Sequence, residues 1–326
     1  MLSFLRNFTP EQQVGLLFVL VFGLLALATV AGILVSLRES KGSVTEPSDR
    51  AQRQGDLQAL LRTAWLMTLV FWVGWAAGDG VATALFGFVS FLILREFISL
   101  SPTRRGDHRS LVLAFFVVLP LQYTLVWTRQ FDLFTVFIPV YVFLAIAAVS
   151  ALAGDPERFL ERNAKLQWGI MVCVYGMSHV PALLMLDFPG FSGNTAFLVF
   201  FLVLVVQTCM LVQHLSARRL LASALGERFH WRSWGAGLLA GGLVGALLSG
   251  LTPFSPLSAV AMALVACLAG TLGHQVMKAI KRDSGVTHWG SAGRSVTGAS
   301  GMLDRVDALC FAAPVFFHSV RWTFNL

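Results

Sequence analysis

The stretch AFLVFFLVLVVQTCMLVQHL, Ala196–Leu215, is a run of 20 residues that contains no charged side chain. A helix of that length is about 30 Å long, which matches the hydrocarbon core of a bilayer. Similar apolar runs recur along the 326-residue chain, which is 56% hydrophobic and only 13% charged. This composition excludes an ordinary soluble domain. It predicts an all-α, polytopic transmembrane helix bundle that forms one integral membrane domain over residues 1–326.

About ten apolar runs are expected to span the membrane. They are Val14–Leu37, Leu60–Gly78, Gly80–Leu94, Leu111–Trp127, Leu133–Ala153, Leu166–Leu186, Ala196–Leu215, Trp234–Leu251, Leu257–Met277 and Ala308–Trp322. The second and third runs are short, and only Gly78-Asp79-Gly80 separates them. The first run lacks a small-residue cleavage site, which indicates an anchor rather than a removable signal.

The basic residues indicate how the bundle is oriented. Connections after the odd-numbered runs hold 21 of the 24 Lys and Arg residues, and only Arg6, Arg129 and Arg321 lie on the other side. The positive-inside rule therefore places these connections in the cytoplasm and both termini outside it. We interpret the net charge of +7 as this orientation signal with some attraction for anionic lipids, and we expect no nucleic-acid partner.

Two of the expected cytoplasmic connections are long. Residues 38–62 are polar and of mixed charge, which indicates a linker between the first two spans. Residues 278–307 are charged and rich in glycine, which is typical of a loop that carries a site. Glu96 ends the third span, where we expect Arg95 and the membrane interface to supply its partners.

Sequence motifs around the second of these connections point to a family. Gly273–Arg282 reads GHQVMKAIKR, and Thr297–Asp307 reads TGASGMLDRVD, followed by the apolar run ALCFAAPVFF. These segments resemble the signature of the phosphatidate cytidylyltransferase (CDP-diacylglycerol synthase) family, approximately GDxxxSxxKR and then KDxGxxxPGHGGxLDRxD. Phe91–Leu100, FLILREFISL, is similar to the end of that family's third helix, so the resemblance covers most of the chain.

The departures from the family signature affect its acidic residues most. His274 stands in place of the aspartate of GD, and His288 stands in place of the aspartate of KD. Cys209 falls where the family carries an acidic cluster, and Thr297–Gly301 replaces the turn that contains proline and histidine. The residues that are kept are Lys281, Arg282, Asp304, Arg305 and Asp307.

The resemblance implies a reaction of CTP with phosphatidate that yields CDP-diacylglycerol and pyrophosphate, a step of phospholipid biosynthesis. Such phosphoryl transfer depends on Mg²⁺, which is usually held by carboxylates. Asp304 and Asp307 share one helical face and are the remaining candidates for catalytic and metal-binding roles. We therefore predict a divergent member in which catalysis is lost or strongly reduced and no cofactor is required.

A residual role in binding phosphate is the leading hypothesis for what such a protein does. The candidate phosphate-binding residues are cationic and are predicted to face the cytoplasm: Arg232, Lys281, Arg282 and Arg305. The expected ligand is a phosphatidate-like phospholipid of a bacterial inner (cytoplasmic) membrane. A scaffold role, with a second copy or another membrane protein as partner, is an alternative form of this hypothesis.

Three other readings stay open on the sequence alone. An active CTP-dependent nucleotidyltransferase would use Mg²⁺ at a site rebuilt around Asp304 and Asp307. Cys209, His274 and His288 are ligand types that Zn²⁺ prefers, so a soft-metal site is a second alternative. An unrelated transporter is the third, although no span contains the buried charge pairs expected of one.

Overall fold

The computed structural model describes residues 71–100, 103–188, 195–220, 230–286, 289 and 301–326, together with scattered positions between 12 and 69. The expected linker at residues 38–62 and the candidate ligand His288 lie outside the described residues. Within the described ranges the chain is helical and contains no strand. The predicted all-α class is therefore confirmed for this part of the chain.

The described helices follow one another along the chain in this order. They are α4 (Asp79–Ser99), η1 (Arg105–Asp107), α5 (His108–Leu113), η2 (Ala114–Val118), α6 (Leu119–Trp127), α7 (Phe131–Val136), η3 (Phe137–Val142), α8 (Phe143–Leu152), α9 (Phe159–Gly169), η4 (Ile170–Gly176), α10 (Met177–Leu184), α11 (Ala196–Leu220), α12 (Trp231–Leu248), η5 (Ser249–Leu251), α13 (Pro256–Asp283) and α14 (Leu303–Phe324).

Six helical runs among the described residues are long and apolar enough to cross a membrane. They are Asp79–Ser99, Arg105–Trp127, Phe131–Leu152, Ala196–Ala217, Trp231–Leu251 and Pro256–Asp283. The protein is thus built from several candidate membrane spans, as predicted. The count of ten spans and the location of the two termini stay predictions.

The break predicted between the second and third apolar runs lies at Gly78. Residues 71–77 are helical, and α4 begins directly after Gly78. Gly78 has a φ of +91°, a backbone conformation that glycine adopts without a steric cost. The chain can therefore change direction between two apolar helices at this residue.

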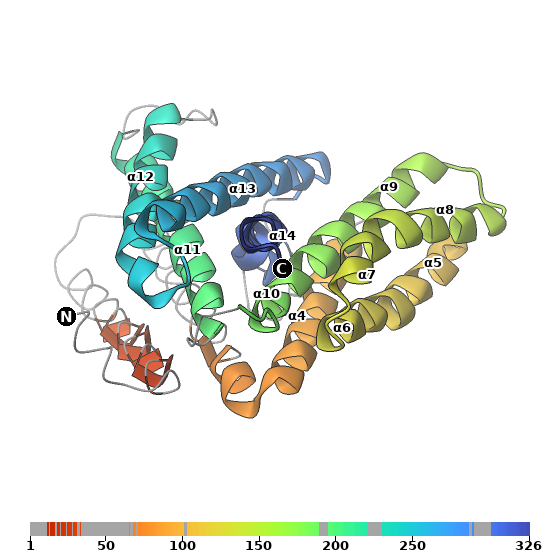
Figure 1. Cartoon of the computed structure of the whole chain (residues 1–326). Coiled ribbons are helices and arrows are strands. Elements are labelled where there is room, and N and C mark those ends of the chain that lie inside the picture. Colours follow the sequence, from red (N-terminus) through yellow and green to blue (C-terminus); the bar gives the residue numbers. More distant parts are fainter. Residues whose placement is uncertain are drawn as a thin grey trace.

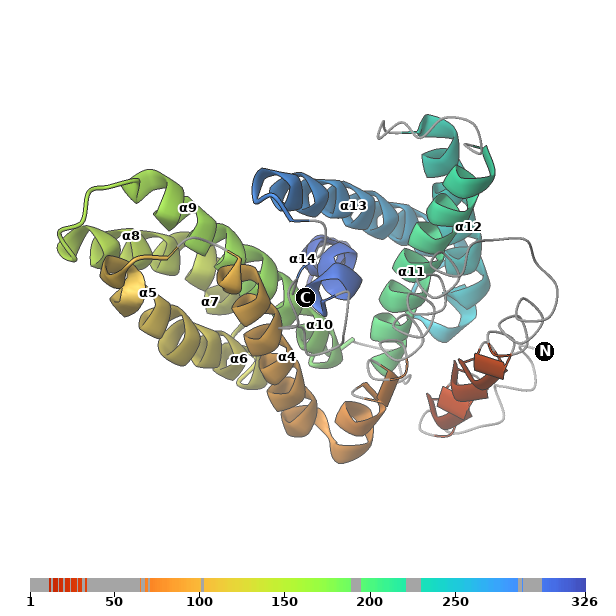
Figure 2. The same cartoon turned by 180° about the vertical axis from the view of Figure 1, so that it is seen from behind.

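Helix α14 occupies the centre of the bundle. In both views it lies between α11, α12 and α13 on one side and the helices from α4 to α10 on the other (Figures 1 and 2). Its residues Ala312, Ala313 and Phe316 are fully buried. The C-terminal helix therefore has the environment of a core helix, not of a peripheral one.

Glycines bring the neighbouring helices into close contact with α14. A Cβ atom on Gly270 of α13 would lie 3.3 Å from the carbonyl oxygen of Ala308, and one on Gly273 would overlap the ring of Phe311. On the opposite side, a Cβ atom on Gly176 of η4 would overlap the carbonyl oxygen of Cys310. Small residues at such crossings allow the helix backbones to approach closely. The crossing of α13 and α14 in turn places the polar ends of these two helices side by side.

Candidate functional site

The two kept aspartates lie in the first turns of α14, and each is bonded to a side chain of α13. Asp304 forms an ion pair with Lys281 through Oδ1, and its Oδ2 accepts a hydrogen bond of 2.9 Å from the backbone N–H of Trp289. Its side chain is only 10% exposed. Both oxygens of this carboxylate are therefore already engaged within the chain.

Asp307 is bonded in a similar way to His274. Its Oδ2 lies 2.8 Å from Nδ1 of His274, and its Oδ1 lies 2.6 Å from the backbone nitrogen of Ala308. A carboxylate can only accept hydrogen bonds, so Nδ1 of His274 carries the hydrogen that it shares with Asp307. The carboxylate is 3% exposed, whereas the imidazole is 29% exposed. The pair thus combines a buried acceptor with a ring that solvent can reach.

A third carboxylate, Glu96, belongs to the same site although the sequence did not assign it there. Its Oε1 and Oε2 accept hydrogen bonds of 3.1 Å and 2.8 Å from the backbone N–H groups of Met302 and Leu303. These donors begin α14, where unpaired N–H groups and the helix dipole favour an anion. The expectation that Arg95 and the interface hold Glu96 is therefore corrected: its hydrogen bonds go to the backbone of a segment more than two hundred residues away.

Glycine at position 301 is required by this arrangement. A Cβ atom there would lie 2.8 Å from both oxygens of Glu96, and it would overlap the carbonyl oxygen of Trp289. The backbone N–H of Gly301 donates to that carbonyl at 2.8 Å. Trp289 is 1% exposed, and its ring stacks on Phe97 of α4 with a centroid distance of 5.2 Å. Trp289 and Gly301 are therefore joined to each other and anchored to α4.

We refer to Glu96, His274, Lys281, Asp304 and Asp307 as the signature cluster. Its members come from three helices: α4, α13 and α14. Four of them, all except Glu96, are predicted as site residues from the sequence, but their pairing is not. The signal that could have revealed Glu96 is a carboxylate at the end of an apolar helix, which needs specific partners.

The four predicted phosphate-binding residues lie in different places. Lys281 is in the signature cluster, and Arg305 directly follows Asp304 in α14. Arg282 is exposed at the C-terminal end of α13. Arg232 is exposed in the first turn of α12, and that end of α12 lies apart from the C-terminal end of α13 in Figures 1 and 2. The structure thus gathers Lys281 and Arg305 at one site and leaves Arg232 on a different part of the surface.

The predicted soft-metal ligands are not gathered at one point in the described part of the chain. Cys209 accepts a hydrogen bond of 3.1 Å from Nε2 of Gln213 and lies 3.9 Å from the hydroxyl of Thr271. His274 is bonded to Asp307 instead. Among the described residues, no group of three or more His, Cys, Asp or Glu side chains is placed to hold a metal ion. Since His288 lies outside them, the zinc hypothesis stays a prediction.

A second charged cluster joins two further connections of the bundle. Arg162, whose side chain is 7% exposed, lies 2.9 Å from Asp155 and 3.4 Å from Asp107. Arg104 pairs with Asp155 at 3.6 Å and also with Glu157. We refer to these five residues as the arginine cluster. Arg104 and Asp107 precede α5, Asp155 and Glu157 precede α9, and Arg162 lies in the first turn of α9. Their ion pairs therefore tie these two parts of the chain together.

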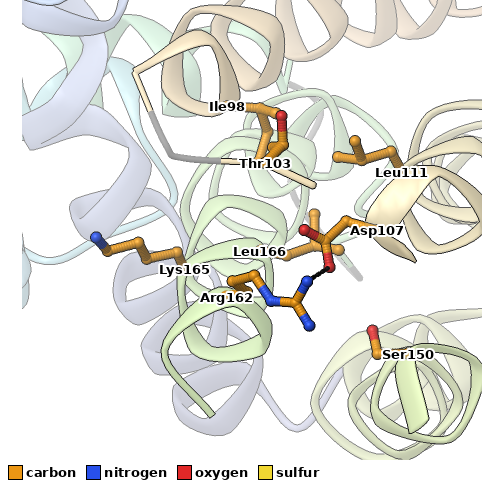
Figure 3. A pocket seen from close by; sticks show the side chains of 8 residues that line it. All are labelled: Ile98, Thr103, Asp107, Leu111, Ser150, Arg162, Lys165 and Leu166. Atoms are coloured by element: carbon orange, nitrogen blue, oxygen red, sulfur yellow. Dashed lines mark ion pairs between the residues drawn. The ribbon is translucent and has the colours of Figure 1, made fainter. Parts of the chain in front are cut away.

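The arginine cluster borders a small pocket (Figure 3). The pocket is lined by Ile98, Thr103, Asp107, Leu111, Ser150, Arg162, Lys165 and Leu166. Figure 3 shows the guanidinium of Arg162 directed toward Asp107, while Lys165 points away from both. The pocket volume is about 20 Å³, which has room for about one water molecule and not for a lipid headgroup. We therefore assign this pocket a structural role, at the point where the arginine cluster joins two connections of the bundle.

Comparisons with known proteins show which family the chain is related to. A sequence model described as the cytidylyltransferase family matches residues 58–323. The chain is also 31% identical over 308 residues to a protein of Escherichia coli (strain K12) called "Uncharacterized protein YnbB". That alignment covers 92% of this chain and 96% of the relative. The region matched by the family includes the whole signature cluster.

Proposed function

Because the chain belongs to the cytidylyltransferase family, we propose that it is a phosphatidate cytidylyltransferase-like membrane protein whose magnesium-dependent catalysis is lost or strongly reduced. It would retain the capacity to bind the phosphate of a phosphatidate-like lipid. The observation that carries this proposal is the pairing of Asp304 with Lys281 and of Asp307 with His274. The family relationship also argues against the transporter alternative.

The donor set of the signature cluster does not fit a magnesium site. Mg²⁺ requires oxygen ligands in near-octahedral geometry, and it is usually bound through carboxylates. Each oxygen of Asp304 and of Asp307 already accepts a hydrogen bond or ion pair from the chain itself. In addition, the residue of α13 that faces Asp307 is a histidine, a poor ligand for this ion. Two carboxylates facing each other would need a cation between them, but a carboxylate facing an imidazole bonds to it directly.

The loss of a metal site is expected to have a large effect on rate. A metal ion that neutralises developing charge lowers the free energy of the transition state by several kcal/mol. This corresponds to a rate increase of about a thousandfold or more. The described residues provide no substitute of comparable charge density. The charge of Lys281, the cation of the signature cluster, is neutralised by its ion pair with Asp304. For this reason we favour phosphate binding over turnover.

The retained binding role draws on the cationic residues near the end of α13. Lys278 and Arg282 are exposed there, one helical turn apart, and Arg305 lies in the first turn of α14. Arginine and lysine at such positions attract lipid phosphates at the membrane surface. A scaffold role with a second copy or another membrane protein stays a prediction.

We further propose the ten-span topology, with both termini extracytoplasmic and the signature cluster facing the cytoplasm of a bacterial inner membrane. The distribution of 21 of the 24 basic residues supports it. A membrane-impermeant maleimide applied to whole cells would then label a cysteine introduced at Gln130 but not one at Asp283. Both positions are exposed, whereas the four native cysteines are buried. The reverse labelling pattern would contradict this orientation.

The decisive test is CTP-dependent conversion of phosphatidate to CDP-diacylglycerol by the purified protein. It should be run with Mg²⁺, Mn²⁺ and Zn²⁺ in parallel, beside the Asp304→Ala and Asp307→Ala variants. We expect no turnover above the variants with any of the three metals. Turnover that disappears in both variants would overturn the proposal. It would then favour the active nucleotidyltransferase, with CTP as second substrate and Asp304 and Asp307 in a rebuilt metal site.

A further inference from the structure

Two exposed arginines at the start of one membrane span carry charges that no described acidic residue neutralises. Arg105 begins η1, and Arg109 follows four residues later in α5. The carboxylates nearby belong to the arginine cluster, where they pair with Arg104 and Arg162. Asp107, which lies between the two exposed arginines in the sequence, is buried and contacts Arg162 at 3.4 Å. The charges of Arg105 and Arg109 are therefore left for a partner outside the chain.

The length of this span indicates the depth of the two arginines in the membrane. The helical run Arg105–Trp127 has 23 residues. At about 1.5 Å per residue it is roughly 35 Å long, which is close to the hydrocarbon thickness of a bilayer. Trp127, at the far end of the run, is 65% exposed, as expected of a tryptophan at a membrane interface. Arg105 and Arg109 therefore lie at the opposite interface, where long basic side chains reach the headgroup phosphates.

An apolar surface continues from the two arginines along the same face of the span. Residues three and four positions apart share one side of a helix, and Val112 and Phe116 follow Arg109 at these spacings. Val112 is 41% exposed and Phe116 is 69% exposed. One face of the span thus presents two cations at the depth of the headgroups and apolar side chains at the depth of the acyl chains. This combination fits a whole lipid molecule, whereas a soluble anion would leave the apolar part unused.

We propose that this face of the span, from Arg105 to Phe116, is a binding site for an anionic phosphodiester lipid such as phosphatidylglycerol. Two guanidinium groups match phosphate oxygens, and they repel the ammonium group of a zwitterionic headgroup. In both views α5 lies at the outer edge of the bundle, apart from α13 and α14 (Figures 1 and 2). The site is therefore separate from the signature cluster. The inference uses the proposed placement of the spans in the membrane, but it does not depend on phosphate binding at that cluster.

The experiment compares dioleoyl phosphatidylglycerol with dioleoyl phosphatidylethanolamine, each titrated into the full-length protein in a non-ionic detergent. Native mass spectrometry counts the bound lipids and gives the affinity of the first one. A basic residue near the membrane surface is worth about fivefold in affinity for an anionic lipid. We therefore expect the wild type to prefer phosphatidylglycerol by about 25-fold. Arg105→Gln and Arg109→Gln should each reduce this preference by about fivefold, and the double variant should abolish it.

Two further variants separate the apolar contact and the overall surface charge from the charges of this site. Phe116→Ala removes apolar surface, so it should weaken the binding of both lipids several-fold and leave their ratio intact. Arg158→Gln is the matched control, because Arg158 is also exposed but its guanidinium pairs with Glu161. This variant should bind both lipids like the wild type. Circular dichroism and thermal unfolding verify that each variant is folded.

Several outcomes would overturn the proposed lipid site. A preference for phosphatidylglycerol that survives in the folded double variant would show that other residues select the lipid. Equal binding of both lipids by the wild type would contradict selection altogether. If Arg158→Gln lost as much preference as Arg105→Gln, the overall surface charge and not this face would be responsible. A final arm uses glycerophosphoglycerol, the headgroup without acyl chains, as competitor. We expect no displacement of the lipid at equal concentration, and full displacement would contradict the role of the apolar surface.

Discussion

The signature cluster and the arginine cluster both consist of charged side chains in a largely apolar protein, but they differ in how exposed their carboxylates are. In the signature cluster the carboxylates are the buried groups: the side chain of Asp307 is 3% exposed and that of Asp304 is 10% exposed. In the arginine cluster one cation and one carboxylate are buried, and the other members are more exposed. The side chains of Arg162 and Asp107 are 7% and 12% exposed, while those of Asp155 and Glu157 are 29% and 64% exposed.

This difference determines what each cluster can do. Carboxylates of the signature cluster are hydrogen-bonded to backbone N–H groups, so they cannot turn toward a new ligand without leaving buried donors unpaired. In the arginine cluster, water can solvate Asp155 or Glu157 when either carboxylate loses its partner. The signature cluster therefore keeps one geometry, which suits recognition of a defined ligand. The arginine cluster holds two connections together and tolerates the loss of one ion pair.

The substitution expected to lower the free energy of unfolding most is at Glu96. Glu96→Ala would leave the N–H groups of Met302 and Leu303 unpaired, and both residues are almost fully buried. Each unsatisfied buried donor costs about 1–3 kcal/mol, so we expect a loss of about 3 kcal/mol in the free energy of unfolding. Denaturant titration in detergent micelles measures the loss, and faster amide exchange at Met302 and Leu303 would locate it.

The control for Glu96 is an acidic residue on the same helix. Asp79 is exposed at the start of α4, and Asp79→Ala removes a carboxylate without unpairing the start of α14. The two variants should therefore differ clearly in stability. If Glu96→Ala were as stable as Asp79→Ala, the buried carboxylate would not be what holds α14 in place.

A smaller loss is expected when the cation of the arginine cluster is removed. Arg162→Met keeps much of the side-chain length but abolishes the contacts with Asp107 and Asp155. Breaking a buried ion pair costs about 3–5 kcal/mol, and the exposure of Asp155 should reduce this to about 2 kcal/mol. The same titration measures it, with Arg158→Met as control, because Arg158 is exposed and bonds only to Glu161. A loss larger than that of Glu96→Ala would reverse the comparison between the two clusters.

Much of the helical architecture could be predicted from hydropathy, and the differences occur at helix ends. The expected span Leu257–Met277 corresponds to α13, which continues to Asp283. Similarly, Ala308–Trp322 corresponds to α14, which begins at Leu303. Hydropathy marks the part of a helix that lies in lipid, while charged residues such as Lys281 extend the helix beyond it. The added turns carry Lys281, Asp304 and Asp307, whereas His274 lies within the expected span.

The pairing within the site could not be predicted, because it depends on how the helices cross. His274 and Asp307 are 33 residues apart and Glu96 and Leu303 are 207 residues apart, so no local pattern connects them. Their contacts follow from the close approach of α13 to α14 at Gly270 and Gly273. The resemblance to the family signature predicts that His274 stands in place of an acidic residue. Only the three-dimensional arrangement shows that it bonds to the remaining aspartate.

The smallest expected effect concerns the response of the arginine cluster to acid. Partial desolvation opposes ionisation of Asp155, but the backbone N–H of Glu157 and the guanidinium of Arg162 outweigh it and lower the pKa of Asp155 below its ordinary value of 3.8. A group with a lowered pKa in the folded state contributes its stabilisation fully above the ordinary value, and loses it as the pH falls through the folded value. The wild type should therefore lose stability below about pH 3.8, and Asp155→Asn should lose less over the same range, as thermal unfolding in a pH series can show. Since Asp155 is accessible to water, the difference between the two proteins should be modest. An identical acid response in both would mean that solvent screens this ion pair completely, and that the contacts of Arg162 with Asp107 and of Arg104 with Glu157 hold the two connections together without it.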